Sequence, residues 1–480
     1  MNIVGRKAQL EKMQQILSSD KAEFITVYGR RRVGKTYLIS EFFTAQDCYF
    51  LKATGKYGGD MKTQLENFTH TLAETFYPGL PLMPFENWQA AFRQINTLLD
   101  TTDPNKKFVL FLDELPWMAS SRSQLLAKLE YFWNHYWSTN PRMILIVCGS
   151  SASWLIKNII HQPGGLHNRT TAIMKIKPFT LLETKQYLHH HKVSLNQREI
   201  MKLYLALGGI PFYLTLVPKG QSASQAIQTL FFEEASPLKE EFTKLFASLF
   251  NDHHRYIDLV RLLANAPNGL SRNDIAQASK HFSDGGRLKE RLADLAAADF
   301  VQTFLPFGKK IGEYYKLTDE FCLFYLKWVD GKTYQQQTAG YWTSQARTPG
   351  YLAWLGLAFE ALCHKHEKQL AKACQLPTGA NIASWRYQPK DKQKKGAQID
   401  LLFDRTDDTI TLCEIKCTQR PFVVTKAEYQ ALQDKRQIFI NTTKTTKQVF
   451  IVLVSMNGVK ANAYSDLLTQ VITGDALFEA

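Results

Sequence analysis

Residues 24–36 read FITVYGRRRVGKT, and this stretch decides the fold. Its first five residues are β-branched or aromatic, as in a buried strand, and a helical pattern begins at Lys35. Between them the sequence fits G-x-x-x-x-G-K-[ST], the pattern of a loop that binds phosphate groups. A strand, this loop and a helix in that order predict the beginning of a parallel α/β sheet with a nucleotide site.

Each residue type in the loop has a physical role in holding phosphates. Gly29 and Gly34 let backbone N–H groups wrap the phosphates, and the helix N-terminus adds positive potential. Lys35 reaches the β and γ oxygens, and the Thr36 hydroxyl ligates Mg²⁺. Tyr37, which follows directly, completes the predicted cofactor-binding set from this loop.

A second motif lies downstream, where residues 108–112 read FVLFL and are followed by Asp113 and Glu114. The carboxyl end of a strand is where α/β sheets place their ligand chemistry. We expect Asp113 to hold Mg²⁺ through water and Glu114 to polarise the attacking water, so both are candidate site residues. The alternative is an acidic turn that only closes the strand. The two motifs in this order predict hydrolysis of ATP or GTP.

Composition sets limits on the class of protein. The 480 residues suggest about three domains. The 45% hydrophobic and 21% charged residues exclude a mostly disordered chain. A net charge of +14 favours a polyanionic partner. The N-terminus is charged and the apolar runs are only strand-length, which predicts a cytosolic protein without a membrane segment. Seven cysteines without a CxxC pair indicate reduced thiols.

The patterns divide the chain into four regions. Residues 1–170 alternate helices with strands near 24–28, 48–52, 108–112 and 143–148, which predicts a parallel α/β core. Residues 171–250 predict a helical lid. Residues 251–330 predict a winged helix: three amphipathic helices, the second capped by Ser271, and two short strands near 300–304 and 313–316. Residues 331–340 predict a linker, and residues 341–480 return to mixed α/β.

Three further sequence boxes resemble a known family. These are IVGRKAQL at 3–10, LDELPW at 112–117 and GGIP at 208–211. Together with the phosphate loop they resemble the archaeal ATPase family, within the AAA+/STAND group of P-loop NTPases and related to origin-recognition ATPases. The resemblance covers residues 1–250 and implies ATP as the nucleotide. It implies that the segment around Val4–Arg6 borders the adenine, that Ser150 or Ser151 senses the γ-phosphate, and that the lid responds to nucleotide.

Four arginines near this site need separate interpretations. Arg169 falls where an arginine finger could lie, with a solvated loop as the alternative. If Arg169 acts in trans, copies of the chain form a ring or an arc. Arg30–Arg32, inside the phosphate loop, are expected to be solvated or to face a partner, because Lys35 supplies the catalytic charge.

The predicted winged helix carries no excess charge. Its expected recognition helix is Gly286–Ala298, with Leu288, Leu292 and Leu295 on the buried face and Arg287 and Arg291 facing outward. Residues 251–330 hold eleven basic and eleven acidic residues, whereas a DNA reader usually has a basic excess. A DNA-binding role and a structural or protein-docking role therefore stay open.

The C-terminal region holds a second constellation. Residues 396–403 read GAQIDLLF and residues 410–417 read ITLCEIKC. If both are strands of one hairpin, Glu414 and Lys416 share a face and Asp400 converges on it. Two carboxylates gather a divalent ion, and a lysine orients or activates water for attack on a phosphodiester.

This constellation resembles the PD-(D/E)xK nuclease superfamily, with its restriction-endonuclease-like α/β fold. Asp400, Glu414 and Lys416 match its motif, and Glu360 on an upstream helix fits the accessory acid often found there. Ile399 stands where many members have proline. An ordinary hairpin with a surface ion pair and a nuclease fold that binds nucleic acid without cutting remain alternatives.

A basic stretch precedes Asp400. Residues 386–395 carry five basic groups and one acid, which is most of the positive excess of the C-terminal region. We expect this stretch to follow a phosphate backbone, with Trp385 and Tyr387 stacking on bases; a solvated loop is the alternative. DNA is therefore the predicted partner of the C-terminal domain.

Two hypotheses of different classes follow. The first is a Mg²⁺-dependent ATPase switch that acts through its lid and winged helix on a nuclease-like domain. The second is a nucleotide-gated regulator or scaffold that binds a protein partner, with an inert nuclease fold.

Overall fold

The computed structural model describes residues 2–120, 122–161, 166, 169–309, 311–331, 340–345, 348–389 and 395–479. Residues 332–339 of the predicted linker lie outside this part of the chain. The chain forms two compact units, each described separately below. Unit 1 comprises Met1–Pro178, Ile210–Phe212 and Ala293–Asp299, and unit 2 comprises Phe179–Gly209, Tyr213–Leu292 and Phe300–Ala480.

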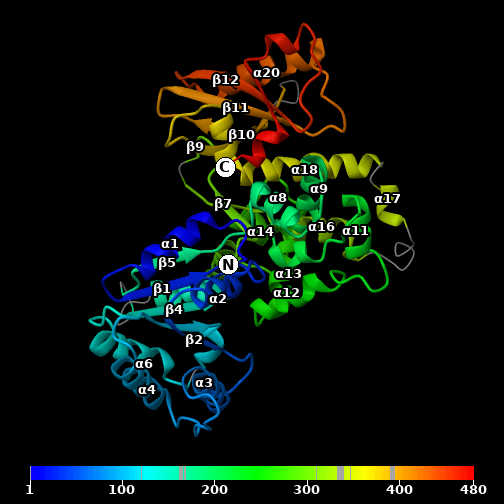
Figure 1. Ribbon diagram of the computed structural model, residues 1–480. Helices are drawn as coiled ribbons and strands as arrows, with labels where there is room; N and C mark the ends of the chain where they lie inside the picture. Colours follow the sequence, from blue (N-terminus) through cyan, green and yellow to red (C-terminus); the bar gives the residue numbers. More distant parts are fainter. Residues whose placement is uncertain are drawn as a thin grey trace. The chain divides into compact units, whose positions relative to one another are not determined.

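Unit 1 is built around a five-stranded sheet in which every pairing is parallel, in the order β2-β3-β4-β1-β5 (Figure 1). The strands are β1 (Glu23–Tyr28), β2 (Tyr49–Thr54), β3 (Phe108–Asp113), β4 (Met143–Gly149) and β5 (Ala172–Lys175). The first four coincide with the predicted strands. The fifth was not predicted and follows the expected boundary at residue 170. The predicted parallel α/β core is confirmed.

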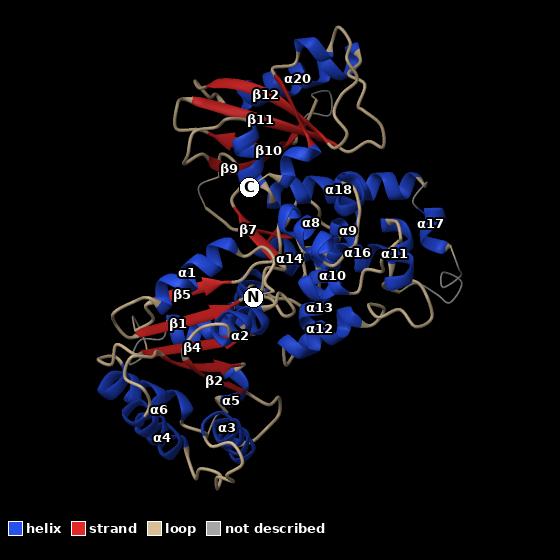
Figure 2. Ribbon diagram, viewed as in Figure 1, coloured by secondary structure: helices blue, strands red, loops and turns tan. Residues whose placement is uncertain are grey.

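Helices cover both faces of this sheet (Figure 2). They are α1 (Lys7–Leu17), α2 (Lys35–Thr44), α3 (Met61–Phe76), α4 (Trp88–Thr101), α5 (Leu115–Met118), α6 (Leu125–Phe132) and α7 (Ala152–Leu155), with π-helical turns η1 (Trp133–Trp137) and η2 (Ile156–Ile160). On one face, Leu110 of β3 joins a buried cluster with Phe68 of α3 and Phe92 of α4. On the other, Phe111 stacks on Phe50, which stacks on Phe43 of α2. Adjacent residues of β3 thus serve opposite faces.

Unit 2 begins with a helical region. Its helices are α8 (Leu181–His190), α9 (Gln197–Leu207), α11 (Ala223–Phe231) and α12 (Glu241–Leu249), while α10 (Pro211–Thr215) spans the boundary between the units. Helix α9 ends at Gly208, whose φ of 63° is in the left-handed region that glycine tolerates. At Gly209 a Cβ atom would lie 1.9 Å from the carbonyl oxygen of Phe179, so only glycine fits there.

A module of three helices and three short strands follows, which we call the three-stranded module (residues 253–317). Its elements are α13 (His253–Ala264), β6 (Leu270–Ser271), α14 (Arg272–Ala278), α15 (Gly286–Ala297), β7 (Val301–Phe304) and β8 (Tyr314–Leu317), and α15 crosses into unit 1. The strands are antiparallel in the order β6-β8-β7. Ser271 caps α14 through a capping box with Asp274, as predicted. The predicted inner leucines, 288, 292 and 295, are buried.

The C-terminal part of unit 2 contains a second five-stranded sheet, in the order β13-β12-β11-β10-β9. Its elements are α16 (Glu320–Trp328), α17 (Tyr341–Gln345), α18 (Pro349–Lys365), α19 (Glu367–Ala373), β9 (Asn381–Tyr387), β10 (Ala397–Asp404), β11 (Thr409–Lys416), α20 (Lys426–Thr443), β12 (Gln448–Ser455), β13 (Gln470–Thr473), and the 3₁₀ turns η4 (Ser465–Leu467) and η5 (Gly474–Phe478). Strands β9 to β11 pair antiparallel and β11 to β13 pair parallel. The predicted hairpin exists, with Leu402 opposite Leu412. Within the described residues, no helix is both long and apolar enough to cross a membrane.

Candidate functional site

The phosphate loop joins β1 to α2 and closes around Lys35. Gly29 has a φ of +153°, and a Cβ atom there would lie 2.2 Å from the carbonyl oxygen of Ile176. Gly34 has a φ of +86°, which also favours glycine. The Lys35 ammonium donates to the carbonyl oxygens of Gly29 at 2.9 Å and Arg30 at 3.1 Å. The loop therefore curves around the charge that the sequence assigned to phosphate binding.

The end of β3 brings the second motif to this loop. Thr36 Oγ1 donates a hydrogen bond of 2.7 Å to Asp113 Oδ2. Asp113 is buried, at 2% exposure. A hydroxyl and a carboxylate side by side are hard oxygen donors, which is the ligand chemistry that Mg²⁺ prefers. The two residues predicted to hold the ion therefore fit it.

Glu114 is held in place from the neighbouring strand. Its φ of 49° is left-handed, and its Oε2 accepts hydrogen bonds from the backbone N–H and the hydroxyl of Ser150, both at 3.0 Å. Ser150 follows β4, which pairs with β3. Of the two serines predicted near the γ-phosphate, Ser150 is thus the one in contact with the predicted catalytic acid.

The predicted adenine-side residue, Arg6, anchors the N-terminal segment. Its guanidinium is buried and donates to the carbonyl oxygens of Lys177 at 2.6 Å and Val33 at 3.0 Å. Tyr37 is 51% exposed and donates through its hydroxyl to the carbonyl oxygen of Asn2. Arg169 lies exposed on a turn.

The expectation that Arg30–Arg32 are solvated is wrong for the first of them. Arg30 is only 1% exposed, so its side chain is buried, and its carbonyl oxygen accepts a hydrogen bond from the Lys35 ammonium. Arg32 is partly exposed and places its guanidinium 4.2 Å from the centre of the Phe212 ring, a cation–π contact.

A parallel sheet with a glycine loop after β1 and an acidic pair after β3 defines a P-loop nucleotide-binding domain. The comparison with known families agrees: residues 3–217 match the model described as an ATPase domain predominantly from Archaea. Residues 3–217 are therefore an archaeal-type ATPase domain, which confirms this part of the predicted resemblance.

Related proteins cover more of the chain. An uncharacterized protein of Methanocaldococcus jannaschii, MJECL04, is 24% identical over 422 residues, covering 86% of this chain and 87% of that protein. The Walker-type ATPase PABY2304 of Pyrococcus abyssi is similar in structure, with a TM-score of 0.51 and 19% identity, covering 68% of this chain and 96% of that one. The ORC2 protein of Aeropyrum pernix matches with a TM-score of 0.41 and 13% identity over 67% of this chain and 92% of that one.

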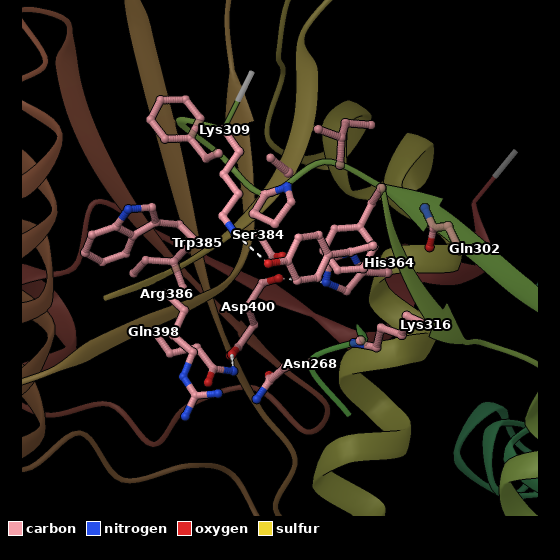
Figure 3. A pocket seen from close by; sticks show the side chains of 18 of the residues that line it. Asn268, Gln302, Lys309, Lys316, His364, Ser384, Trp385, Arg386, Gln398 and Asp400 are labelled. Atoms are coloured by element: carbon pink, nitrogen blue, oxygen red, sulfur yellow. Dashed lines mark hydrogen bonds between the residues drawn. The ribbon is translucent and has the colours of Figure 1, made fainter. Parts of the chain in front are cut away.

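Unit 2 contains the second predicted site, on the hairpin of β10 and β11. Lys416 Nζ lies 3.0 Å from Glu414 Oε1, as expected for residues on one face of β11. Asp400 of β10 accepts a hydrogen bond of 3.1 Å from Gln398 Nε2, and its backbone oxygen accepts one of 2.7 Å from His364 Nε2 (Figure 3). Because α18 carries both His364 and Glu360, this contact brings the predicted accessory acid to the hairpin.

Shifted pKa values indicate that these acids influence one another. Burial raises the pKa of Glu360 to about 7, and the negative charge of Asp400 adds to the shift. Burial likewise raises the pKa of Asp400, and the negative charge of Glu414 raises it further. Lys316 of β8 faces Glu360 and Asp400. Burial lowers the pKa of Lys316, and the negative charges of Glu360 and Asp400 oppose this shift only in part. The three predicted acids and Lys316 therefore belong to one electrostatic cluster, which we call the carboxylate cluster.

The carboxylate oxygens of this cluster are ligands that a divalent metal ion prefers, but their present positions do not form a metal site. Lys435 of α20 donates to both carboxylate oxygens of Glu414, at 2.8 and 2.6 Å. Among the described residues, no three or more His, Cys, Asp or Glu side chains are grouped so as to hold a metal ion. An ion at Glu414 therefore requires that Lys435 first give up its contacts.

Sequence reasoning missed Lys316 and Lys435. Neither has a spacing relation to the Asp400, Glu414 and Lys416 motif, since Lys316 arrives from the three-stranded module and Lys435 from α20. The only available signal was that a buried glutamate needs a partner cation.

The stacking role expected for Trp385 is wrong. Trp385 is 6% exposed and packs edge-on against Phe439 of α20, with ring centres 5.0 Å apart, because its position in β9 faces the core. Tyr387 is partly buried and stacks on Trp385. Of the predicted basic stretch, residues 390–394 lie outside the described residues.

Proposed function

We propose that this protein is a Mg²⁺-dependent ATP-hydrolysing switch whose nucleotide state governs a nuclease-like centre in unit 2 that acts on DNA. The observation that carries the first half is the contact between Thr36 and Asp113, which joins the two nucleotide motifs. The carboxylate cluster, together with Lys416 beside Glu414, supports the second half.

In the nucleotide site each residue keeps a separate task. Lys35 exchanges its contacts with the loop carbonyls for the β and γ oxygens of ATP. Thr36 and Asp113 hold Mg²⁺, which neutralises charge on the phosphates. When ATP is bound, Glu114 breaks its hydrogen bond with Ser150 and polarises the attacking water. Ser150 is then the residue that senses the γ-phosphate. Arg169 is exposed and accessible to the nucleotide site of a neighbouring copy.

In the carboxylate cluster, Asp400 and Glu414 would hold a divalent ion once Lys435 has released Glu414, with Glu360 as the accessory acid. Lys416 orients the water that attacks the phosphodiester. The three-stranded module, which we take to be a winged helix, adds Lys316 beside Glu360 and Asp400. In this proposal the coupling runs through this module and needs no DNA bound to α15. Arg291, one of the two arginines expected to face DNA, is paired with Asp252 at 2.6 Å.

Two matched variants test the two halves separately. Lys35→Ala is expected to lose ATP binding and hydrolysis, and unchanged ATP turnover in this variant would refute the nucleotide assignment. Asp400→Ala is expected to abolish Mg²⁺- or Mn²⁺-dependent cleavage of plasmid DNA while ATP hydrolysis persists. Cleavage that survives Asp400→Ala would remove the proposed centre from the reaction.

A second candidate function is a nucleotide-gated regulator that binds a protein partner through the three-stranded module, with an inert nuclease fold. The contacts of Lys435 with both oxygens of Glu414 favour it, because they fill the place of an ion. Salt titration separates the two functions. A DNA-acting protein loses DNA affinity steeply as salt rises, and a scaffold binds little DNA at any salt concentration.

A further inference from the structure

Three members of the carboxylate cluster, Lys316, Glu360 and Asp400, line a cavity of about 590 Å³ within unit 2. One wall is the β7–β8 hairpin of the three-stranded module, which contributes Phe304, Lys309, Tyr314 and Lys316. The opposite wall is strand β9, with Ser384 and Arg386. Asp400 and Glu360 line the same cavity, and Figure 3 shows Asp400 between the hairpin side, with Lys316, and the β9 side, with Arg386.

The β7–β8 hairpin contacts β9 and the core beside it. The backbone N–H of Phe307, in the hairpin turn, donates a hydrogen bond of 3.0 Å to the carbonyl oxygen of Ser384. The Phe307 ring lies 5.4 Å from the ring of Phe439, at the edge of the hydrophobic core below the sheet. The three-stranded module thus forms one wall of the space in front of Asp400.

The lining of this cavity combines two kinds of groups. Lys309 and Arg386 are exposed cations on opposite walls, where they can meet successive phosphates. Without a strand, Lys309 Nζ donates to the Tyr314 hydroxyl and lies 4.5 Å from the centre of the Tyr314 ring. Phe304 and Tyr314 are cross-strand neighbours with ring centres 5.9 Å apart, and both line the cavity. Cations that follow a backbone beside aromatic rings are the composition of sites for single nucleic-acid strands.

The size of the cavity suits a single strand. A volume of about 590 Å³ lies in the range of pockets for small ligands, roughly 300–1,000 Å³, and holds about one or two nucleotides. A DNA duplex, whose major groove alone is about 12 Å wide, does not enter a space of this size. A single strand fits between the two walls and reaches Asp400.

We propose that the cavity between the β7–β8 hairpin and β9 binds a single nucleic-acid strand and presents its backbone to the carboxylate cluster. Arg386 holds phosphate, and Lys309 does so once it has left the Tyr314 ring; the rings of Phe304 and Tyr314 then hold bases. Cleavage of the bound strand depends on the proposed nuclease-like function, whereas binding of the strand does not. It also gives the three-stranded module a role in substrate selection that does not depend on α15.

The test measures binding by fluorescence anisotropy of the full chain in EDTA, where no cleavage occurs. The probes are a fluorescein-labelled oligo-dT of 20 nucleotides, the matching oligo-U, a blunt duplex of 20 base pairs and, as competitor, dTMP. We expect the single strands to bind at least about tenfold more tightly than the duplex at low salt. The DNA and RNA probes decide which strand is preferred. Duplex binding as tight as strand binding overturns the proposal, as does displacement of the strand by dTMP at equal concentration.

Charge variants locate the binding. Lys309→Ala and Arg386→Ala are each expected to weaken strand binding about three- to tenfold, because each removes a phosphate contact. Lys368→Ala, on α19, and Arg420→Ala, after β11, remove matched exposed charges of unit 2 outside the cavity and are expected to leave binding unchanged. Equal affinities in all four variants refute the site. All four side chains are exposed, so loss of folding does not confuse the result.

Two further variants separate this proposal from the proposed nuclease reaction. Asp400→Ala is expected to lose cleavage and to keep strand binding, so that a failure of one function does not hide the other. Phe307→Ala removes the contact of the hairpin with Phe439. We expect a smaller ratio of single-strand affinity to duplex affinity in this variant. An unchanged preference in a folded Phe307→Ala protein contradicts the role of the hairpin as the excluding wall.

Discussion

Thr36 Oγ1 donates a hydrogen bond to Asp113 Oδ2 over 2.7 Å, and this contact joins the phosphate loop to the carboxyl end of β3. The two residues are far apart in the sequence, and each came from a different motif. Their contact explains why both motifs are needed: the hydroxyl and the carboxylate together make the oxygen-rich place that a hard cation requires.

The first prediction follows from the charge of this pair. Asp113→Asn keeps an oxygen that accepts from Thr36 but removes the negative charge. We expect affinity for ATP in the presence of Mg²⁺ to fall about 10- to 100-fold, to the level that wild type has in EDTA. Titration with a fluorescent ATP analogue with and without Mg²⁺ measures this. Thr36→Ser keeps the hydroxyl and serves as the control. A variant that still gains affinity from Mg²⁺ would show that Asp113 does not serve the ion.

The second prediction concerns the hydrogen bonds between Glu114 and Ser150. Glu114→Gln is expected to bind ATP like wild type and to hydrolyse it about 10²- to 10⁴-fold more slowly, because the amide cannot take up a proton from water. Ser150→Ala removes only one of the two bonds that hold Glu114, the backbone bond being retained, so its effect should be smaller. Single-turnover hydrolysis gives both rates. A Glu114→Gln protein that turns over at the wild-type rate would assign activation of water to another residue.

The third prediction tests the close approach at Gly209, where a Cβ atom would lie 1.9 Å from the carbonyl oxygen of Phe179. Gly209→Ala must displace backbone, since the Gly209 carbonyl also accepts a hydrogen bond from the N–H of Phe179. We expect a loss of several kcal/mol in the stability of unit 2, on the order of 3 kcal/mol or more. Gly285→Ala, with open space around the new methyl group, is the matched control. Equal urea midpoints for the two variants would contradict the packing described.

The parts of the fold that were predictable depend on local patterns. Strands β1 to β4 are buried runs of apolar residues, and burial of both faces leaves a continuous signal in the sequence. Strand β5 escaped prediction because it has four residues, of which Ile173 is 49% exposed, so that neither length nor pattern marks it. The hairpin of β10 and β11 was predictable because a polar turn separates two apolar runs.

The parts of the sites that were not predictable depend on tertiary packing. Lys316 and Lys435 reach the carboxylate cluster from other elements, and nothing near them in the sequence refers to Asp400 or Glu414. For Arg30 and Trp385 the local sequence is misleading about exposure. Each lies in or beside a run of charged residues, and that polarity suggests an exposed position, although both side chains are buried.

The last prediction concerns His366, which lies beside the N-terminus of α8. Its Nδ1 donates to the carbonyl oxygen of Leu362 at 3.0 Å, and its Nε2 accepts from the N–H of Leu181 at 3.1 Å. Both ring nitrogens are therefore satisfied only in the neutral form, and burial lowers the pKa of His366 to about 4. The positive charge of Lys365 lowers this pKa further, and an added proton at Nε2 would also face a donor, so folding opposes protonation.

This shift sets the sign of a pH dependence. Because the unfolded chain binds the proton near pH 6.5 and the folded chain only near pH 4, stability from His366 is complete above pH 6.5 and is lost as the pH falls toward 4. His366→Gln is uncharged at every pH and lacks this loss. The advantage of wild type over the variant in unfolding free energy should therefore shrink by about 2 kcal/mol between pH 7.5 and pH 5. Urea unfolding followed by tryptophan fluorescence measures it. Other titrating groups, Glu360 included, are common to both proteins and cancel in the difference, so an advantage that stays constant with pH would show that His366 is not held neutral against Leu181.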